Sequence, residues 1–272
     1  MKASERILAA LTWTAAAMTI GILLYLLVFI MIKGIPYLKS SLFAFTYTSN
    51  NASLTPALVS TVIITAMSLL IATPLGLFAA IYLTEYARRG NKAVVLVRMT
   101  TETLAGIPSI VYGLFGMLFF VTALGWGFSV LAGAFTLAIM ILPLIMRTAE
   151  EAILSVPDIW REGAFSLGAG RLRTVFRIVL PAAMPGILAG VILAVGRIVG
   201  ETAALIYTSG TVAQIPVTPM QSARTLSVHL YALSCEALHT DQGYATAVVL
   251  LVVVILINAA SASIARRFGA KK

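Results

Sequence analysis

Two ionisable side chains, Arg197 and Glu201, lie inside an apolar run and are the first candidates for chemistry. Residues 184–208 carry no other charge. In a helix, a spacing of four places both side chains on one face. A charge at the centre of a membrane helix costs roughly 2.5–3.5 kcal/mol, so such residues usually face the bundle interior or a water-filled path. One possibility is a self-contained ion pair that stabilises the helix bundle. The other is an anion site, in which Glu201 orients Arg197 and the guanidinium binds an oxyanion through two parallel hydrogen bonds.

Small residues beside this pair favour the anion site. Gly196 and Gly200 flank Arg197 and leave room for a ligand or a close helix. A second irregular segment, residues 105–109, contains Gly106 and Pro108. It predicts a turn and a helix start near Ser109, where free backbone N–H groups favour anions, although a plain helix cap has the same pattern.

Other kinds of chemistry find no support in the sequence. The run Gly168-Ala169-Gly170 lacks the lysine of a phosphate-binding loop, and no nucleophile lies beside a base. His229 and His239 are ten residues apart with Cys235 between them, a spacing too open for a typical metal site. We therefore expect no enzyme activity in this chain, no bound metal and no cofactor of its own.

The composition indicates an integral membrane protein. Of the 272 residues, 60% are hydrophobic and 11% are charged, against about 45–50% and about 25% in ordinary globular chains. A soluble enzyme, a disordered chain and a disulfide-stapled scaffold are all excluded, the last because there is one cysteine.

Long uncharged stretches predict six membrane-spanning helices in a single domain covering residues 1–272, because a crossing needs about 20 apolar residues. The first stretch, 26 residues long, exceeds the usual apolar core of a signal peptide, so we expect it to be retained. A turn is predicted at Gly125-Trp126-Gly127. The expected helices are 7–32, 57–83, 103–124, 128–146, 184–208 and 242–265.

The positive charges predict the orientation. Fifteen of the 19 Lys and Arg residues lie in the two termini and in the segments 85–102 and 147–181. Because cytoplasmic segments are rich in Lys and Arg, both termini and these two segments are expected in the cytoplasm. The net charge of +9 then reflects membrane topology, and nucleic acid is not an expected partner.

The segment 147–181 predicts a short helix outside the bilayer. Pro157-Asp158 marks its start, and Gly168 with Gly170 marks its end. Its small residues are flanked by bulky ones, which suits either a knob that enters a partner protein or a helix lying on the membrane surface. These residues are Gly163 and Ala164, with Trp160, Phe165 and Leu167 around them.

This segment resembles the EAA loop of ABC importer permeases. Glu162-Gly163-Ala164 is followed after three residues by Gly168, and nine residues later by Ile178-Val179-Leu180-Pro181, with Gly163 as the one departure from the pattern. The resemblance implies an all-α integral membrane protein of six transmembrane helices with the type I importer (MetI-like) fold. It also implies a cytoplasmic coupling helix that docks into a separate ATPase subunit. The coupling residues implied are Glu162, Gly163, Ala164, Gly168, Leu180 and Pro181.

Three further runs are similar to permeases of phosphate ABC transporters, and in particular to their A-type (PstA-like) subunit: residues 196–203, 106–113 and 147–152. The resemblance implies import of inorganic phosphate across a bacterial cytoplasmic (inner) membrane. It also implies a pathway that includes Arg197, Glu201, Ser109 and Thr202.

The partners that follow from this resemblance are a C-type (PstC-like) permease subunit, two PstB-like ATPase subunits that bind ATP-Mg, and a periplasmic or lipid-anchored phosphate-binding protein, all within or beside membrane lipid. Three alternatives stay open: an ABC permease for sulfate, molybdate or another oxyanion, a stand-alone secondary anion carrier, and a non-transporting membrane scaffold. A stand-alone carrier has no use for an ATPase-docking loop.

Overall fold

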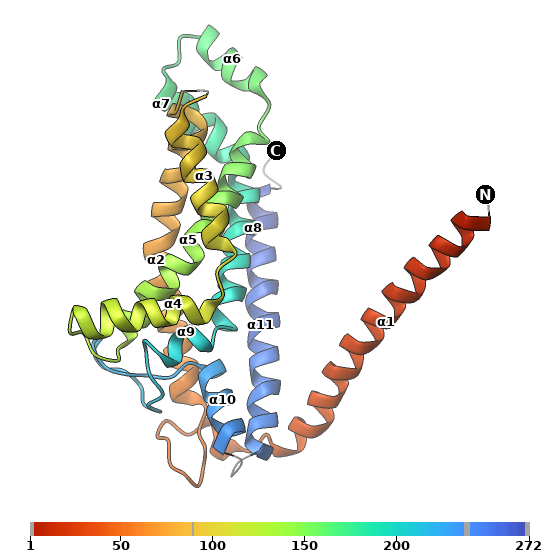
Figure 1. The fold of residues 1–272 in the computed structure, drawn as a ribbon, viewed down its shortest axis with the longest axis vertical. Coiled ribbons are helices and arrows are strands. Elements are labelled where there is room, and N and C mark those ends of the chain that lie inside the picture. Colours follow the sequence, from red (N-terminus) through yellow and green to blue (C-terminus); the bar gives the residue numbers. More distant parts are fainter. Residues whose placement is uncertain (1–2, 89, 237–239, 270–272) are drawn as a thin grey trace.

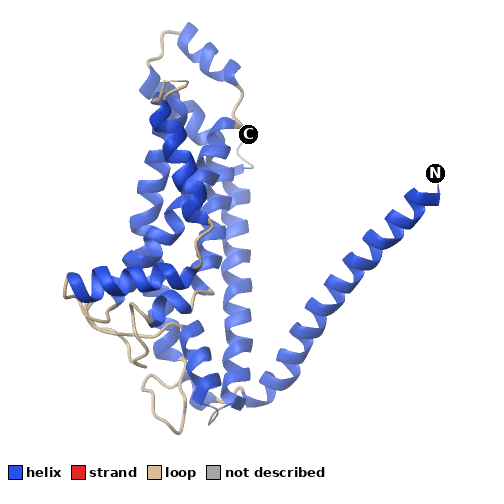
Figure 2. Ribbon diagram, in the orientation of Figure 1, coloured by secondary structure: helices blue, strands red, loops and turns tan. Residues whose placement is uncertain are grey.

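The computed structural model describes residues 3–88, 90–236 and 240–269, and this part of the chain consists of helices and connecting loops (Figure 2). Apolar runs and good helix formers explain the long helices, which satisfy their own backbone hydrogen bonds as a membrane requires. The α-helices are α1 (Ala3–Gly34), α2 (Thr55–Ile81), α3 (Lys92–Ala105), α4 (Ser109–Gly116), α5 (Val130–Leu154), α6 (Asp158–Ser166), α7 (Arg171–Thr174), α8 (Leu180–Val199), α9 (Ala203–Ile206), α10 (Leu226–Glu236) and α11 (Thr240–Gly269).

Helices α2, α5 and α8 form the centre of the bundle, and α11 packs along α8 (Figure 1). Large apolar side chains at the centre are at most 2% exposed and form one continuous cluster, which includes Ile64, Leu137, Ile141 and Ile198. Close packing of these side chains, rather than removal of apolar surface from water, holds membrane helices together. The central cluster fixes the helix ends that carry the candidate site.

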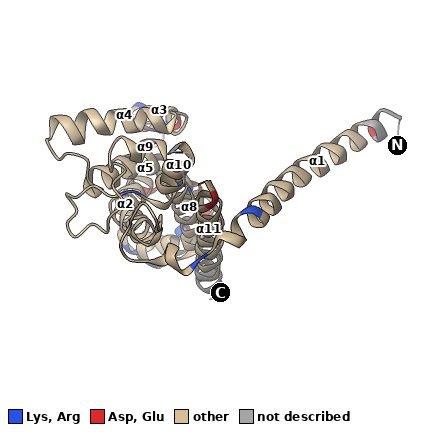
Figure 3. Ribbon diagram, turned by 90° about the horizontal axis from the view of Figure 1, so that it is seen from below, with Lys and Arg blue, Asp and Glu red and all other residues tan. Residues whose placement is uncertain are grey.

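Helix α1 leans away from this bundle and meets it near Gly34, where Phe29 packs edge-on against Tyr244 of α11 at 6.0 Å (Figure 1). Its most apolar stretch is 0% buried. The start of α1 and the last turns of α11 lie toward the end of the molecule that carries α6. Seen from the opposite end, charged residues are sparse along the helices (Figure 3).

Within the described residues, five helical stretches are long and apolar enough to cross a membrane, and a sixth crossing results if the bent pair α3 and α4 counts as one. The prediction of one continuous helix over 103–124 is wrong. Helix α3 begins earlier, at Lys92, and α4 leaves it at an angle of 100°. The bend falls at Gly106–Pro108, where the proline lacks an N–H and disfavours a helical residue before it. The predicted turn at residues 105–109 is therefore confirmed.

The fourth predicted helix, 128–146, is too short at its far end. Helix α5 extends from Val130 to Leu154, so the beginning of the predicted loop 147–181 is helical. Charged residues in this last part of α5 form ion pairs. Arg98 of α3 pairs with Glu150, and Arg147 pairs with Glu151 at 3.0 Å. The predicted turn before α5 is confirmed, since Gly125 and Gly127 have φ of 67° and 65°.

The fifth predicted helix, 184–208, is misplaced at both ends. The helical span runs from Arg171 to Val199, passing through a π-helical turn at Val175–Val179 into α8. It stops at Gly200, and α9 follows as a separate turn. Helix α10 was not predicted, and it occupies a segment that the sequence suggested was loop.

The other three predicted helices differ from the structure only at their ends. Segment 7–32 corresponds to Ala3–Gly34, and segment 242–265 to Thr240–Gly269. Segment 57–83 corresponds to Thr55–Ile81, which continues into a π-helical turn at Tyr82–Tyr86.

Candidate functional site

The end of α8 places the two charged residues differently from the prediction. Arg197 lies in the last turn of α8, but Glu201 lies beyond its end in the connection to α9. The hydroxyl of Ser227 donates a hydrogen bond to the Val199 carbonyl, which satisfies a backbone group at the helix end. The expectation that Arg197 and Glu201 share a helix face is therefore wrong, because glycine, the weakest helix former after proline, ends the helix between them.

Glu201 has a structural partner of its own. Its Oε1 accepts a hydrogen bond from the Ala204 backbone N–H at 3.1 Å, so the carboxylate caps the start of α9. The residue is 9% exposed. The expected ion pair with Arg197 is absent from the described chain. Thr202, half-buried, is the residue that precedes α9.

Arg197 is exposed and forms no ion pair with any described residue. Its guanidinium lies within electrostatic reach of the phenol of Tyr112 on α4. That phenol donates a hydrogen bond to the Leu104 carbonyl at 2.8 Å, which ties α4 to α3 across the 100° bend. Tyr112 was not predicted as a site residue, although it lies in the run 106–113 that carries part of the family resemblance.

Helix α4 touches α9 through a glycine. A Cβ added to Gly113 would lie 2.8 Å from the Ala204 Cα, so the two backbones are in direct contact. Ser109, half-buried at the start of α4, precedes Gly113 by four residues and shares its helix face. The two interrupted helices therefore meet with Ser109, Tyr112, Arg197, Glu201 and Thr202 on the segments around the two breaks.

This arrangement can attract an anion. Arg197 brings an uncompensated positive charge, and the first turn of α4 has no side-chain cap for its backbone N–H groups. Interrupted helices at membrane depth are tolerated where they are buried in protein or line a water-filled cavity. The geometry therefore suits a small oxyanion better than a cation.

A buried cation, Arg224, lies just before the start of α10. Arg224 is 5% exposed, and its guanidinium carbon stands 4.5 Å from the centre of the Tyr47 ring. His229, fully buried, packs edge-on against the same ring at 6.0 Å. Burial and the charge of Arg224 lower the pKa of His229 to about 3, although the nearby Ala52 backbone opposes this shift. The imidazole is therefore neutral at physiological pH.

The structure describes no group of three or more His, Cys, Asp or Glu residues that could hold a metal ion. His239, which belonged to the weak histidine pattern in the sequence, lies outside the described residues.

The short helix that the sequence predicts within segment 147–181 is present as α6. It begins at Asp158 after Pro157, and Gly168 follows its end with φ of 79°. Glu162 and Gly163 are exposed, whereas Ala164 is 5% exposed. Leu180 and Pro181 lie in the first turn of α8, on the continuous helix that leads back into the bundle. Bulky apolar side chains on and just after α6 face solvent: Ile159, Trp160, Phe165 and Leu167.

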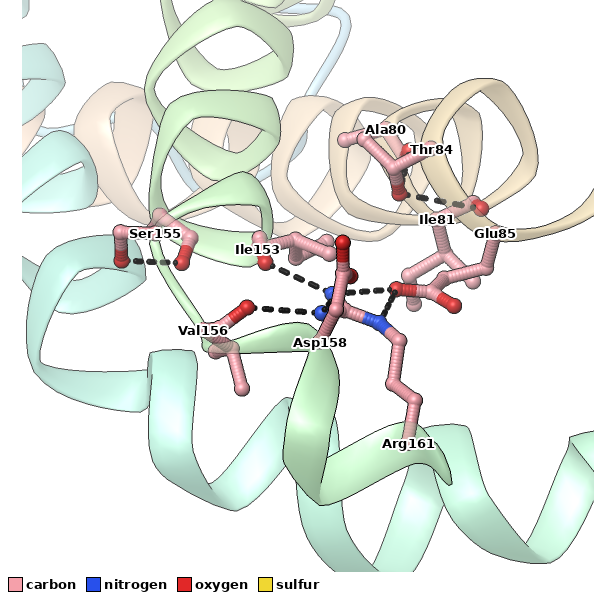
Figure 4. Close-up of polar contacts among 10 residues, drawn as sticks. Ala80, Ile81, Thr84, Glu85, Ile153, Ser155, Val156, Asp158 and Arg161 are labelled. Atoms are coloured by element: carbon pink, nitrogen blue, oxygen red, sulfur yellow. Dashed lines mark hydrogen bonds and ion pairs between the residues drawn. The ribbon is translucent and has the colours of Figure 1, made fainter. Parts of the chain in front are cut away.

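Arg161 fastens α6 to the bundle (Figure 4). Its Nε and Nη2 donate to Glu85 Oε1 at 3.0 and 2.8 Å. Its Nη1 donates to the Val156 carbonyl at 2.7 Å and to Asp158 Oδ1 at 3.0 Å, and Nη2 also donates to the Ile153 carbonyl at 3.0 Å. Sequence reasoning missed this network, because Glu85 and Arg161 are 76 residues apart.

Comparison with known protein families gives one extended match. Residues 72–272 match the family described as binding-protein-dependent transport system inner membrane component. The probable ABC transporter permease YqgI of Bacillus subtilis is 33% identical over 258 residues, which cover 88% of this chain and 86% of the relative. The phosphate transport system permease protein PstA 1 of Mycobacterium tuberculosis is 35% identical over 211 residues, which cover 76% of this chain and 69% of the relative.

Two solved transporters share the fold. The inward-facing MetNI methionine ABC transporter matches with a TM-score of 0.62 at 21% identity, covering 78% of this chain and 93% of that chain. A bacterial alginate ABC transporter in complex with its periplasmic protein matches with a TM-score of 0.64 at 19% identity, covering 94% of both chains. Methionine and alginate are chemically unlike, so this fold alone does not fix a substrate.

Proposed function

The chain belongs to the family of binding-protein-dependent transport system inner membrane components, and from that premise we propose that it moves inorganic phosphate into the cytoplasm. It is a multi-pass inner membrane protein and the permease subunit of an ABC importer. This family has no catalytic site of its own and no bound cofactor, because the partner ATPases use the ATP. A stand-alone carrier and a non-transporting scaffold are excluded by this membership.

The observation that carries the phosphate proposal is the uncompensated charge of Arg197. The side chain is exposed where the α8–α9 connection meets α4, and no described carboxylate neutralises it. A guanidinium matches the geometry of phosphate oxygens and can donate two hydrogen bonds at once. The PstA similarity at 35% identity supports phosphate as the anion. In this proposal Ser109 and Thr202 offer hydroxyls along the same path, and Glu201 keeps the α8–α9 connection in shape.

The proposed complex contains a C-type permease beside this chain, two PstB-like ATPases on the α6 side and a phosphate-binding protein on the opposite side. Glu162, Gly163, Ala164 and Gly168 would meet the ATPase, and Leu180 with Pro181 would pass its movement to α8. The ends of α1 and α11 that lie toward α6 would then be cytoplasmic, in agreement with the distribution of Lys and Arg. ATP can shift the permease between states only by binding one of them better.

Transport of a related oxyanion is the second candidate, because sulfate and molybdate would meet the same guanidinium. Uptake of labelled phosphate by cells that carry this chain with its neighbouring subunits separates the two. Uptake that persists in excess sulfate and molybdate supports phosphate. Uptake that either competitor abolishes contradicts the phosphate proposal and moves the substrate to that oxyanion.

A further inference from the structure

We propose that Arg161 is a positioning residue that locks the coupling helix α6 to the end of α2 and the end of α5, so that the three move as one unit when the ATPase moves. This proposal rests on the chain being an ABC importer permease and does not depend on phosphate as the substrate. Its basis is the set of five hydrogen bonds from one guanidinium to three segments of the chain (Figure 4).

The ion pair between Arg161 and Glu85 is largely buried. The side chains of Arg161 and Glu85 are 14% and 9% exposed. Removing one partner of a buried pair leaves an uncompensated charge in a poorly hydrated place, which is strongly unfavourable. By contrast, Arg147 and Glu151 form a pair with side chains 58% and 64% exposed, and exposed pairs contribute little.

The guanidinium also joins two backbone carbonyls near the end of α5. The carbonyls of Ile153 and Val156 belong to the end of α5 and the turn after it, and both accept from Arg161. A guanidinium carries five N–H donors in a fixed planar fork, and here it makes five hydrogen bonds to two carbonyls and two carboxylates. A lysine ammonium has three donors and could not make all five of these hydrogen bonds.

Glu85 occupies an irregular turn at the end of the helical span that begins with α2. It lies in the π-helical turn Tyr82–Tyr86, which ends with the Ala87 N–H donating to the Tyr82 carbonyl at 2.9 Å. Such turns insert an extra residue into a helix and are frequent at functional sites. This turn directly continues α2, which packs along α5 through the centre of the bundle. Movement of α6 would therefore be transmitted through the Arg161–Glu85 ion pair to a central transmembrane helix.

Helix α6 itself has little apolar attachment. Ala164 is its one buried residue, and Ile159 is 70% exposed. The polar lock of Arg161 therefore contributes to holding α6 against the ends of α2 and α5.

The first test measures ATP hydrolysed per substrate molecule moved, in the full transporter complex reconstituted in lipid vesicles. In Arg161→Met this ratio should rise about fivefold or more, the lower end of typical coupling between sites, while the ATPase subunits stay bound. Arg161→Lys and Glu85→Gln should give intermediate ratios, because each keeps part of the network. Arg147→Met, which removes an exposed arginine from the end of α5, should leave the ratio unchanged. A wild-type ratio in Arg161→Met, with the ATPase bound, would overturn the proposal.

The second test needs no substrate, so it separates this proposal from the assignment of phosphate. Spin labels are placed on cysteines at the exposed positions Tyr82 and Ser166 of the complex, with Cys235→Ser to remove the native thiol. The distance between the labels should be the same with and without ATP in the wild-type background, and should shift or broaden with ATP in Arg161→Lys and Glu85→Gln, which preserve side-chain size. Equal ATP-dependent changes in all three backgrounds would contradict the lock.

Discussion

Gly113 of α4 and Ala204 of α9 are in backbone contact, and a Cβ on residue 113 would lie 2.8 Å from the Ala204 Cα. This contact holds the two interrupted helices together, with Tyr112 and Glu201 close to it in the chain. Small residues let helices approach in this way in membranes, where packing rather than hydrophobicity drives association.

Gly113→Ala should therefore destabilise the protein. The added methyl meets backbone, which cannot rotate away, so we expect a loss of about 1–3 kcal/mol in the free energy of unfolding. The midpoint of thermal unfolding in detergent measures this. Gly196→Ala is the matched control, because nothing lies within 4 Å of its added Cβ, and alanine should be neutral or slightly stabilising in that helix. Equal midpoints for both variants would show that α4 and α9 are not tightly packed.

Gly163→Glu should disconnect the ATPase without unfolding the permease. Residue 163 is exposed on α6, with nothing within 4 Å of an added Cβ, so the larger side chain changes only the outer surface. We expect loss of co-purifying ATPase or loss of ATP-driven uptake, with wild-type levels of permease in the membrane. Gly170→Glu places the same charge at another open, exposed glycine and should retain both properties. Intact complex and uptake in Gly163→Glu would refute α6 as the coupling helix.

His229 should make the protein less stable in mild acid. Its pKa is about 3 in the folded protein and about 6.5 in an unfolded chain. Between these values the unfolded chain binds a proton that the folded protein does not, so the free energy of unfolding falls as pH drops below about 6.5. At pH 5 the loss is about 2 kcal/mol.

Thermal unfolding of the wild type and of His229→Phe at pH 8 and pH 5 tests this effect. Phenylalanine keeps an aromatic ring against Tyr47 but cannot titrate. The wild type should lose more stability between the two pH values than the variant does. The same loss in both proteins would assign the acid sensitivity to other groups.

Local sequence signals identified several features correctly, for physical reasons that are themselves local. The start of α6 follows from Pro157, and its end from Gly168 with φ of 79°. The turn before α5 follows from two glycines, and the break before α4 from Gly106 and Pro108. In each case the backbone preference of one or two residues decides the structure.

Features that depend on distant partners could not be predicted. A continuous helix through Gly200 was the natural expectation from an apolar run, but Ser227 satisfies the end of α8 and Glu201 caps α9. The lock between Arg161 and Glu85 joins residues far apart in sequence. The contact between Arg224 and Tyr47 depends on the folding of two separate loops, which no local pattern predicts.

ATP-driven uptake of labelled phosphate into vesicles that contain the whole complex measures whether Arg197 binds the transported anion. Arg197→Gln removes the charge but keeps hydrogen-bonding capacity, and Arg177→Gln makes the same change at an exposed site near the other end of the same helical span. A hydrogen bond to a charged group contributes about 1.5–3 kcal/mol, so uptake should fall at least about tenfold in Arg197→Gln. Arg177→Gln should transport at the wild-type rate. Wild-type uptake by Arg197→Gln, in a complex that retains its ATPase subunits, would contradict a phosphate path through Arg197.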